Sequence, residues 1–120
     1  MLETTLIKKR EQMTRKPMHE CHGGERAIDW IEVLSKEELK DKKLNFIHDD
    51  ILPPGASIGV QTHERDEEYY YIVSGCGEMI LNGKIFELKD SDITAVFPGG
   101  SHGLKNKGSD EMRIFVLSVS

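Results

Sequence analysis

The 120-residue sequence has two cysteines, one tryptophan and no long hydrophobic run. Cys21 and Cys76 form no CxxC pair and are too few for a disulfide framework, so we expect reduced thiols in a reducing compartment. No apolar stretch approaches the length of a membrane span, and residues 1–16 lack the apolar core of a signal peptide. The sequence therefore predicts a cytoplasmic protein that does not bind a membrane.

Positive charge is also scarce, because the formal net charge is -5. Binding to nucleic acid depends on neutralising phosphates with lysine and arginine, so this balance argues against a nucleic-acid partner. The basic residues that gather near the start fall in a segment, residues 1–24, that we interpret as an N-terminal arm. Residues 25–120 then have the size of one domain with its own core.

Helical patterns are rare. The S-x-x-E pattern from Ser35 to Glu38 is typical of a helix capping box, and it predicts at most one short helical turn before Lys43. Elsewhere short strand-like segments alternate with turn residues such as Asn82-Gly83. This spacing predicts an all-β antiparallel sandwich or barrel. The predicted strands cover residues 27–33, 44–52, 56–61, 67–73, 77–81, 84–88, 93–97, 102–106 and 112–119.

The segment GVQTHERDEEYYYIVSG, residues 59–75, carries unusually many ionisable groups for a strand region. Side chains alternate between the two faces of a strand, so Gln61 and His63 share one face, and Glu68 and Tyr70 share the face of the apolar Ile72. A carboxylate on a buried face needs a partner or a metal ion. By contrast, we expect residues 64–66 to be solvated charges in the turn between the two strands.

A second segment, FPGGSHGLKN at residues 97–106, supplies the partner. A Pro-Gly turn ends one strand there and His102 opens the next. His63, Glu68 and His102 together make a set of two histidines and one carboxylate, which suits Fe(II), Mn(II), Ni(II) or Zn(II). The sequence therefore predicts one divalent transition-metal ion per chain.

These two segments resemble the motifs of the cupin family. The first family motif, G-x5-H-x-H-x(3 or 4)-E-x6-G, corresponds to Gly55, Gln61-Thr62-His63, Glu68 and Gly75. The second, close to P-x-G-x2-H-x3-N, corresponds to Pro98-Gly99-Gly100-Ser101-His102 followed by Asn106. The resemblance covers about fifty residues in two separate blocks.

The resemblance implies a double-stranded β-helix, or jelly-roll barrel, with the metal ligands pointing into the barrel. It also implies a homodimer, because small cupins commonly pair through sheet edges and the N-terminal segment, here residues 1–24.

One departure bears on the metal. Gln61 stands where the family usually has a histidine, and an amide oxygen is a weaker donor than imidazole. Gln61 is then either a weak fourth ligand or a hydrogen-bond donor to a bound substrate. The alternative is that metal binding has been lost and the three other residues form a hydrogen-bonded polar cluster.

Two functions remain open on this evidence. In the first, the chain is a metal-dependent enzyme of the dioxygenase, decarboxylase or isomerase type, acting on a small polar or carboxylate-containing molecule, with Tyr70 and Gln61 as candidate catalytic residues. In the second, it binds or senses a small ligand without catalysis. His48 is either a core histidine or a second group in the cavity. We interpret residues 19–24 as a loop entering the first strand, because their spacing matches no structural zinc site.

Overall fold

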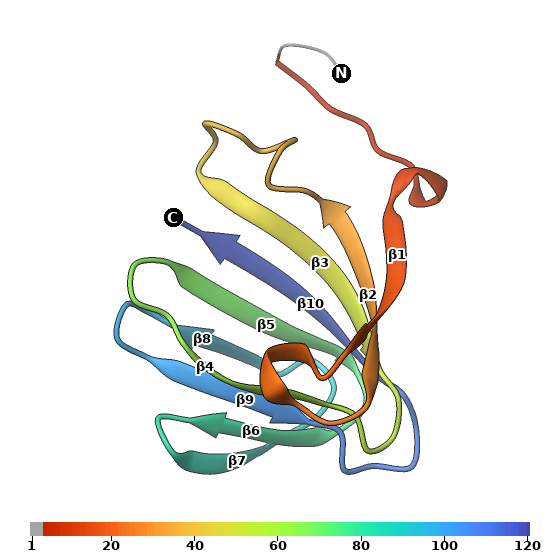
Figure 1. The fold of residues 1–120 in the computed structure, drawn as a ribbon, viewed down its shortest axis with the longest axis vertical. Helices are drawn as coiled ribbons and strands as arrows, with labels where there is room; N and C mark the ends of the chain where they lie inside the picture. Colours follow the sequence, from red (N-terminus) through yellow and green to blue (C-terminus); the bar gives the residue numbers. More distant parts are fainter. Residues whose placement is uncertain (1–3) are drawn as a thin grey trace.

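The computed structural model describes residues 4–120, and in them ten strands form two antiparallel sheets (Figure 1). The first sheet has the order β1-β2-β3-β10-β5-β8, and the second has the order β4-β9-β6-β7. This arrangement confirms the predicted all-β jelly roll. The strands are β1 (Thr14–His19), β2 (Ala27–Leu34), β3 (Leu44–Leu52), β4 (Ser57–Thr62), β5 (Glu67–Ser74), β6 (Gly77–Leu81), β7 (Lys84–Leu88), β8 (Ile93–Val96), β9 (Ser101–Lys105) and β10 (Met112–Val119).

The alternation of side chains along β10 shows how the sheet separates core from surface. Met112, Ile114, Val116 and Ser118 are buried, and the residues between them are exposed or half-buried. They pack with other fully buried side chains between the two sheets, among them Leu52, Ile72, Met79 and Leu104. The strands β3, β6, β7 and β10 begin and end at the predicted residues.

Strand β1 was not predicted. Its sequence, TRKPMH, is charged and contains Pro17, and only Met18 is even partly buried. These are features of an edge strand, which needs no apolar face on both sides and tolerates proline and charge. β1 pairs antiparallel with β2 along its whole length, so part of the predicted N-terminal arm belongs to the first sheet.

The segment after Ser35 makes one hydrogen-bonded turn, in which the Leu39 N–H donates to the Ser35 carbonyl, and it does not extend into a regular helix. The capping box is present, since the Glu38 N–H donates to Ser35 Oγ and the Ser35 N–H donates to Glu38 Oε1. The chain then leaves the helical path at Asp41, whose φ of 63° lies in the left-handed region. The regular helical elements in residues 4–120 are instead two 3-10 turns, η1 (Arg10–Gln12) and η2 (Cys21–Gly23). Neither is long or apolar enough to cross a membrane.

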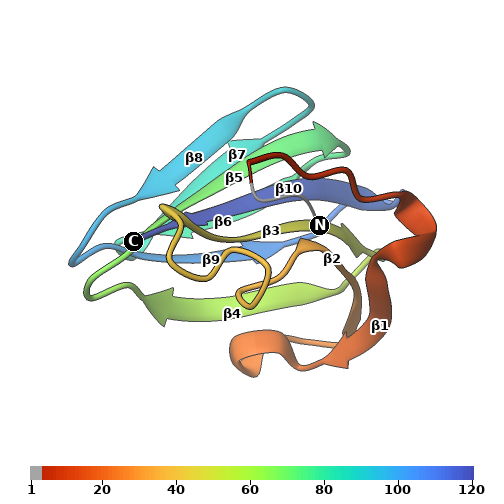
Figure 2. The same ribbon diagram turned by 90° about the horizontal axis from the view of Figure 1, so that it is seen from above.

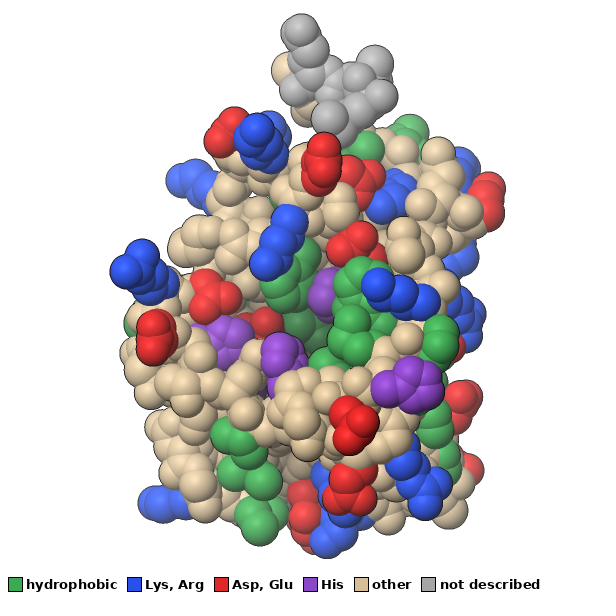
Figure 3. All heavy atoms as spheres, viewed as in Figure 1, with side chains coloured by type: hydrophobic (Ala, Val, Ile, Leu, Met, Phe, Trp, Pro, Cys, Tyr) green, Lys and Arg blue, Asp and Glu red, His purple; other side chains and the backbone are tan. Residues whose placement is uncertain are grey.

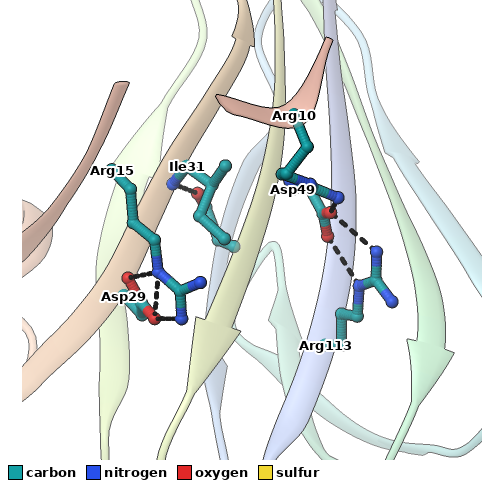
Figure 4. A network of polar contacts seen from close by, with 7 residues as sticks. Arg10, Arg15, Asp29, Ile31, Asp49 and Arg113 are labelled. Carbon is teal, nitrogen blue, oxygen red and sulfur yellow. Dashed lines mark hydrogen bonds and ion pairs between the residues drawn. The ribbon is translucent and has the colours of Figure 1, made fainter. Parts of the chain in front are cut away.

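On the outer face of the first sheet, Asp49 of β3 is a buried carboxylate held by two arginines (Figure 4). Arg113 donates to both of its oxygens at 2.8 and 2.7 Å, and Arg10 of η1 donates to Oδ2 at 2.6 Å. Beside them, Arg15 of β1 pairs with Asp29 of β2. The hydrogen bonds from Arg113 and Arg10 outweigh the effect of burial and lower the pKa of Asp49.

This network predicts an acid-dependent loss of stability. Because the pKa of Asp49 is lower in the folded chain, its contribution is complete above the ordinary aspartate pKa of about 4 and disappears as the pH falls through the lower folded value. Asp49→Asn should therefore flatten the fall in unfolding free energy below about pH 4. Urea unfolding at several pH values measures this. Asp41→Asn, in an exposed loop, is the matched control, and an Asp49→Asn curve parallel to the wild type would contradict the assignment.

Candidate metal centre

The backbone places His63 next to His102. In the register of β4 and β9, Gln61 lies opposite His102, and His63 follows two residues later at the end of β4. The His63 N–H donates to the carbonyl of Gly100, and the Gly99 N–H donates to the carbonyl of His63. Gly99 has a φ of 96°, which favours glycine, so the Pro-Gly turn identified in the sequence is what ties the two segments together.

Three buried side chains converge at this point: His63, Glu68 and His102 (the His–Glu–His cluster). The Nε2 atoms of the two histidines are 3.1 Å apart, and Glu68 Oε1 lies 3.1 Å from His102 Nε2 and 3.5 Å from His63 Nε2. Two ligand atoms at right angles, each bonded to a metal at about 2.0–2.2 Å, are roughly 3 Å apart. The spacing of the cluster therefore fits one face of a metal coordination sphere.

Asp66 orients one of the two imidazoles. Its Oδ1 lies 3.0 Å from His63 Nδ1, and its Oδ2 accepts a hydrogen bond from Ser118 Oγ of β10 at 3.2 Å. A carboxylate at Nδ1 fixes the ring and leaves Nε2 free to bind a metal, a common arrangement for metal-binding histidines. Partial burial favours protonation of Asp66, yet its pKa is lowered because of the contact with His63. The expectation that Asp66 is simply a solvated turn residue is wrong.

Tyr70 packs against the His102 ring of the cluster. Its ring is tilted against the His102 imidazole with a centroid distance of 4.6 Å, and the residue is 3% exposed. His102 Nδ1 has no hydrogen-bond partner in residues 4–120. The His102 ring is therefore oriented by packing against Tyr70, whereas the His63 ring is oriented by its hydrogen bond with Asp66. Burial raises the pKa of Tyr70 well above its usual value, with a further contribution from the Glu68 charge. A catalytic role for Tyr70 stays a prediction.

The amide of Gln61 forms a hydrogen bond with the cluster. Its Nε2 donates to Glu68 Oε1 at 3.2 Å, the same oxygen that faces the two histidines. The half-buried side chain thus lies where the sequence motif places it, and it holds the carboxylate in position. Its roles as a weak ligand or as a donor to substrate stay predictions.

A cavity of about 710 Å³ opens directly onto the His–Glu–His cluster. In Figure 3, histidine side chains gather around a hollow on this face, with hydrophobic side chains between them. The residues that line it come from both sheets and from η2, which lies beside β4 (Figure 2). They are Met18, Cys21, His22, Trp30, Glu32, Ser35, Lys36, Glu37, Phe46, His48, Asp50, Gln61, Thr62, His63, Asp66, Glu68 and Val116.

Sequence reasoning left the place of His48 open and did not identify Asp50 as a residue of the cavity. His48 enters the cavity, which resolves the choice left open for it, and Asp50 lies beside it. Phe46, His48 and Asp50 alternate along β3 and so share a face, but the apolar residues of that strand suggested a closed core. Burial raises the pKa of Asp50, against the opposing effect of His48. Burial also raises the pKa of the Cys21 thiol to about 11, so this group stays protonated near neutral pH.

Two facing β-sheets with a buried cluster of two histidines and a glutamate beside a cavity define a jelly-roll protein with a candidate metal site. The sequence comparison agrees, because the family described as "Cupin domain" matches residues 50–119. The chain belongs to the cupin family.

Among known proteins, the chain is similar to an oxalate-binding protein of Thermotoga maritima, with 29% identity over 97% of this chain and 95% of that protein. A crystal structure of a predicted oxalate decarboxylase from the same organism superimposes with a TM-score of 0.87 and 28% identity, covering 95% of this chain and 98% of that one. The cupin domain of Schizosaccharomyces pombe Cnp3 shares the fold, with a TM-score of 0.70 and 16% identity over 88% of this chain and 68% of that one.

Proposed function

We propose that this protein binds one divalent transition-metal ion through His63, Glu68 and His102 and uses that ion to hold a small carboxylate in the cavity. The observation that carries the proposal is the convergence of three ligand atoms, 3.1–3.5 Å apart, beside a cavity that His63 and Glu68 line. When bound, the ion would act as a Lewis acid that attracts carboxylate oxygens. The similarity to a protein named for oxalate binding supports this class of ligand.

Charge makes the ion necessary for such a ligand. Five carboxylates line the cavity, namely Glu32, Glu37, Asp50, Asp66 and Glu68, against the single lysine Lys36. An anion entering the metal-free cavity would meet like charges in a partly desolvated space, which is unfavourable. A divalent ion at the His–Glu–His cluster reverses that local charge. Carboxylate binding should therefore depend strictly on the metal.

Calorimetric titration tests both halves of the proposal. Protein dialysed against a chelator should take up about one equivalent of Mn(II), Fe(II), Ni(II) or Zn(II), and oxalate should then bind only to the metal-loaded protein. The ion that binds most tightly under matched conditions also identifies the preferred metal. Absence of uptake for all four ions would overturn the metal site. Equal oxalate affinity with and without metal would overturn the role of the ion.

Turnover of the carboxylate is a second candidate function, of the decarboxylase, dioxygenase or isomerase type. The observation that favours it is a second ionisable pair in the same cavity, His48 and Asp50, with 3.7 Å between Nδ1 and Oδ2. Such a pair can move a proton to or from a ligand held at the metal. Release of carbon dioxide or consumption of dioxygen by the metal-loaded protein would distinguish an enzyme from a binding protein.

A further inference from the structure

The cavity extends well beyond the His–Glu–His cluster, across the strands of the first sheet. In the register of that sheet, Glu68 of β5 lies opposite Ser118 of β10, which lies opposite Phe46 of β3. Neighbouring strands are about 4.8 Å apart, so the two ends of this row are separated by roughly 10 Å. A molecule as small as oxalate, bound at the metal end, would leave the far end of the cavity empty.

Three rings form that far end: Trp30, Phe46 and His48 (the aromatic wall). His48 stacks on Phe46 with a centroid distance of 4.4 Å and an interplanar angle of 21°. Trp30 meets His48 edge-on at 4.9 Å. The rings are only partly buried in the chain, so a flat apolar group can still cover the surface that they present to the cavity.

The carboxylate beside the aromatic wall is already held within the chain. Asp50 accepts a hydrogen bond from the Ile31 N–H and faces His48, so its carboxylate already has partners.

At the rim, the carboxylates of Glu32 and Glu37 and the ammonium of Lys36 line the cavity. The ammonium of Lys16 lies 4.9 Å from the centre of the Trp30 ring, and that of Lys36 lies 5.7 Å from the Phe46 ring. A second charged group on a ligand would gain little in these partly solvated surroundings, which already hold charges of both signs. Apolar burial against the rings is the larger available contribution.

We infer that the aromatic wall is a second subsite for the aryl group of a monocarboxylic acid whose carboxylate lies at the His–Glu–His cluster. This inference rests on the proposed metal-dependent carboxylate binding and specifies its ligand class. The separation of roughly 10 Å across two strand spacings sets the length of the ligand. A ring joined to a carboxylate through a short alkyl chain has about that reach once the metal–oxygen bond is included.

The test compares propionate with 3-phenylpropionate as ligands of the Mn(II)-loaded protein, by isothermal titration calorimetry. Burying one ring against the aromatic wall should make 3-phenylpropionate bind about 10-fold more tightly than propionate. Trp30→Ala should reduce this ratio to near one, and Phe46→Ala provides a second variant at the same subsite. A ratio of two affinities is insensitive to partial loss of folded protein. Phe86→Ala, which removes an exposed ring on β7, is the matched control and should leave the ratio unchanged.

Several outcomes would overturn the inference. Equal affinity for propionate and 3-phenylpropionate in the wild type would remove the subsite while leaving metal-dependent carboxylate binding intact. A preference that survives in both Trp30→Ala and Phe46→Ala would place the ring elsewhere. Binding of 6-aminohexanoate as tight as that of 3-phenylpropionate would assign the far end to a cation. Failure of both carboxylates and of oxalate to bind would overturn the proposed function as well.

Discussion

Replacing His102 with alanine should lower the affinity for the preferred divalent metal by more than about 100-fold, because losing a ligand should cost more than the 10–100-fold typical of losing an outer hydrogen bond. His102 lies at the centre of the cluster, since its Nε2 is 3.1 Å from His63 Nε2 and 3.1 Å from Glu68 Oε1. It is also 1% exposed, so water cannot easily take its place. Metal titration of chelator-treated protein measures the effect.

Two further variants make this result specific. His19→Ala removes an exposed imidazole at the end of β1, away from the cavity lining, and should leave metal affinity unchanged. Gln61→His adds a stronger donor beside Glu68 and should raise the affinity. Wild-type affinity in His102→Ala, with thermal unfolding showing a folded protein, would rule out the His–Glu–His cluster as the metal site.

Replacing Gly59 with alanine should destabilise the protein by about 1–3 kcal/mol or more, the cost of overpacking, and should open one side of the cavity. A Cβ at this position of β4 would lie 1.9 Å from the carbonyl oxygen of His22 in η2. The contact is mutual, because a Cβ on Gly24 would lie 2.1 Å from the Ser57 carbonyl oxygen. Both neighbours are backbone atoms, so a side chain cannot rotate out of the way.

Urea unfolding followed by the fluorescence of Trp30 measures this effect, because the single tryptophan lies in the cavity lining. Gly83→Ala is the matched control: it sits in open space, and alanine there meets only the strain of a φ of 80°. That strain costs roughly 1–2 kcal/mol. An unfolding midpoint for Gly59→Ala equal to that of the wild type would show that η2 does not need this close approach.

Much of the fold could be predicted because local patterns determine it. The alternation of β10 and the turn residues around β6 and β7 each depend on neighbours in the sequence. Strand β1 has no such pattern, because an exposed edge strand is stabilised by pairing with β2 and not by an apolar face. The capping box at Ser35 predicted one short turn at most, and the chain makes that single turn before it leaves the helical path at Asp41.

The convergence of His63, Glu68 and His102 could be predicted in the same way, since these residues lie in two short motifs with characteristic spacing. The role of Asp66 was missed although it lies three residues from His63, because the side chain is also held by Ser118, which is distant in the sequence and adjacent only through the pairing of β5 with β10. The aromatic wall has the same origin: Trp30 and His48 meet because β2 and β3 pair, a relation that no single segment reveals.

Strand β10 lies between β5 and β3 and so separates the two ends of the cavity. Residues at the two ends, such as Glu68 and Phe46, are separated by a full strand and share no direct contact among those described. Free-energy changes from substitutions about 10 Å apart are usually additive. Substitutions on β2 and β3 can therefore alter the far end of the cavity in independent steps, while the His–Glu–His cluster near β4, β5 and β9 is retained unchanged.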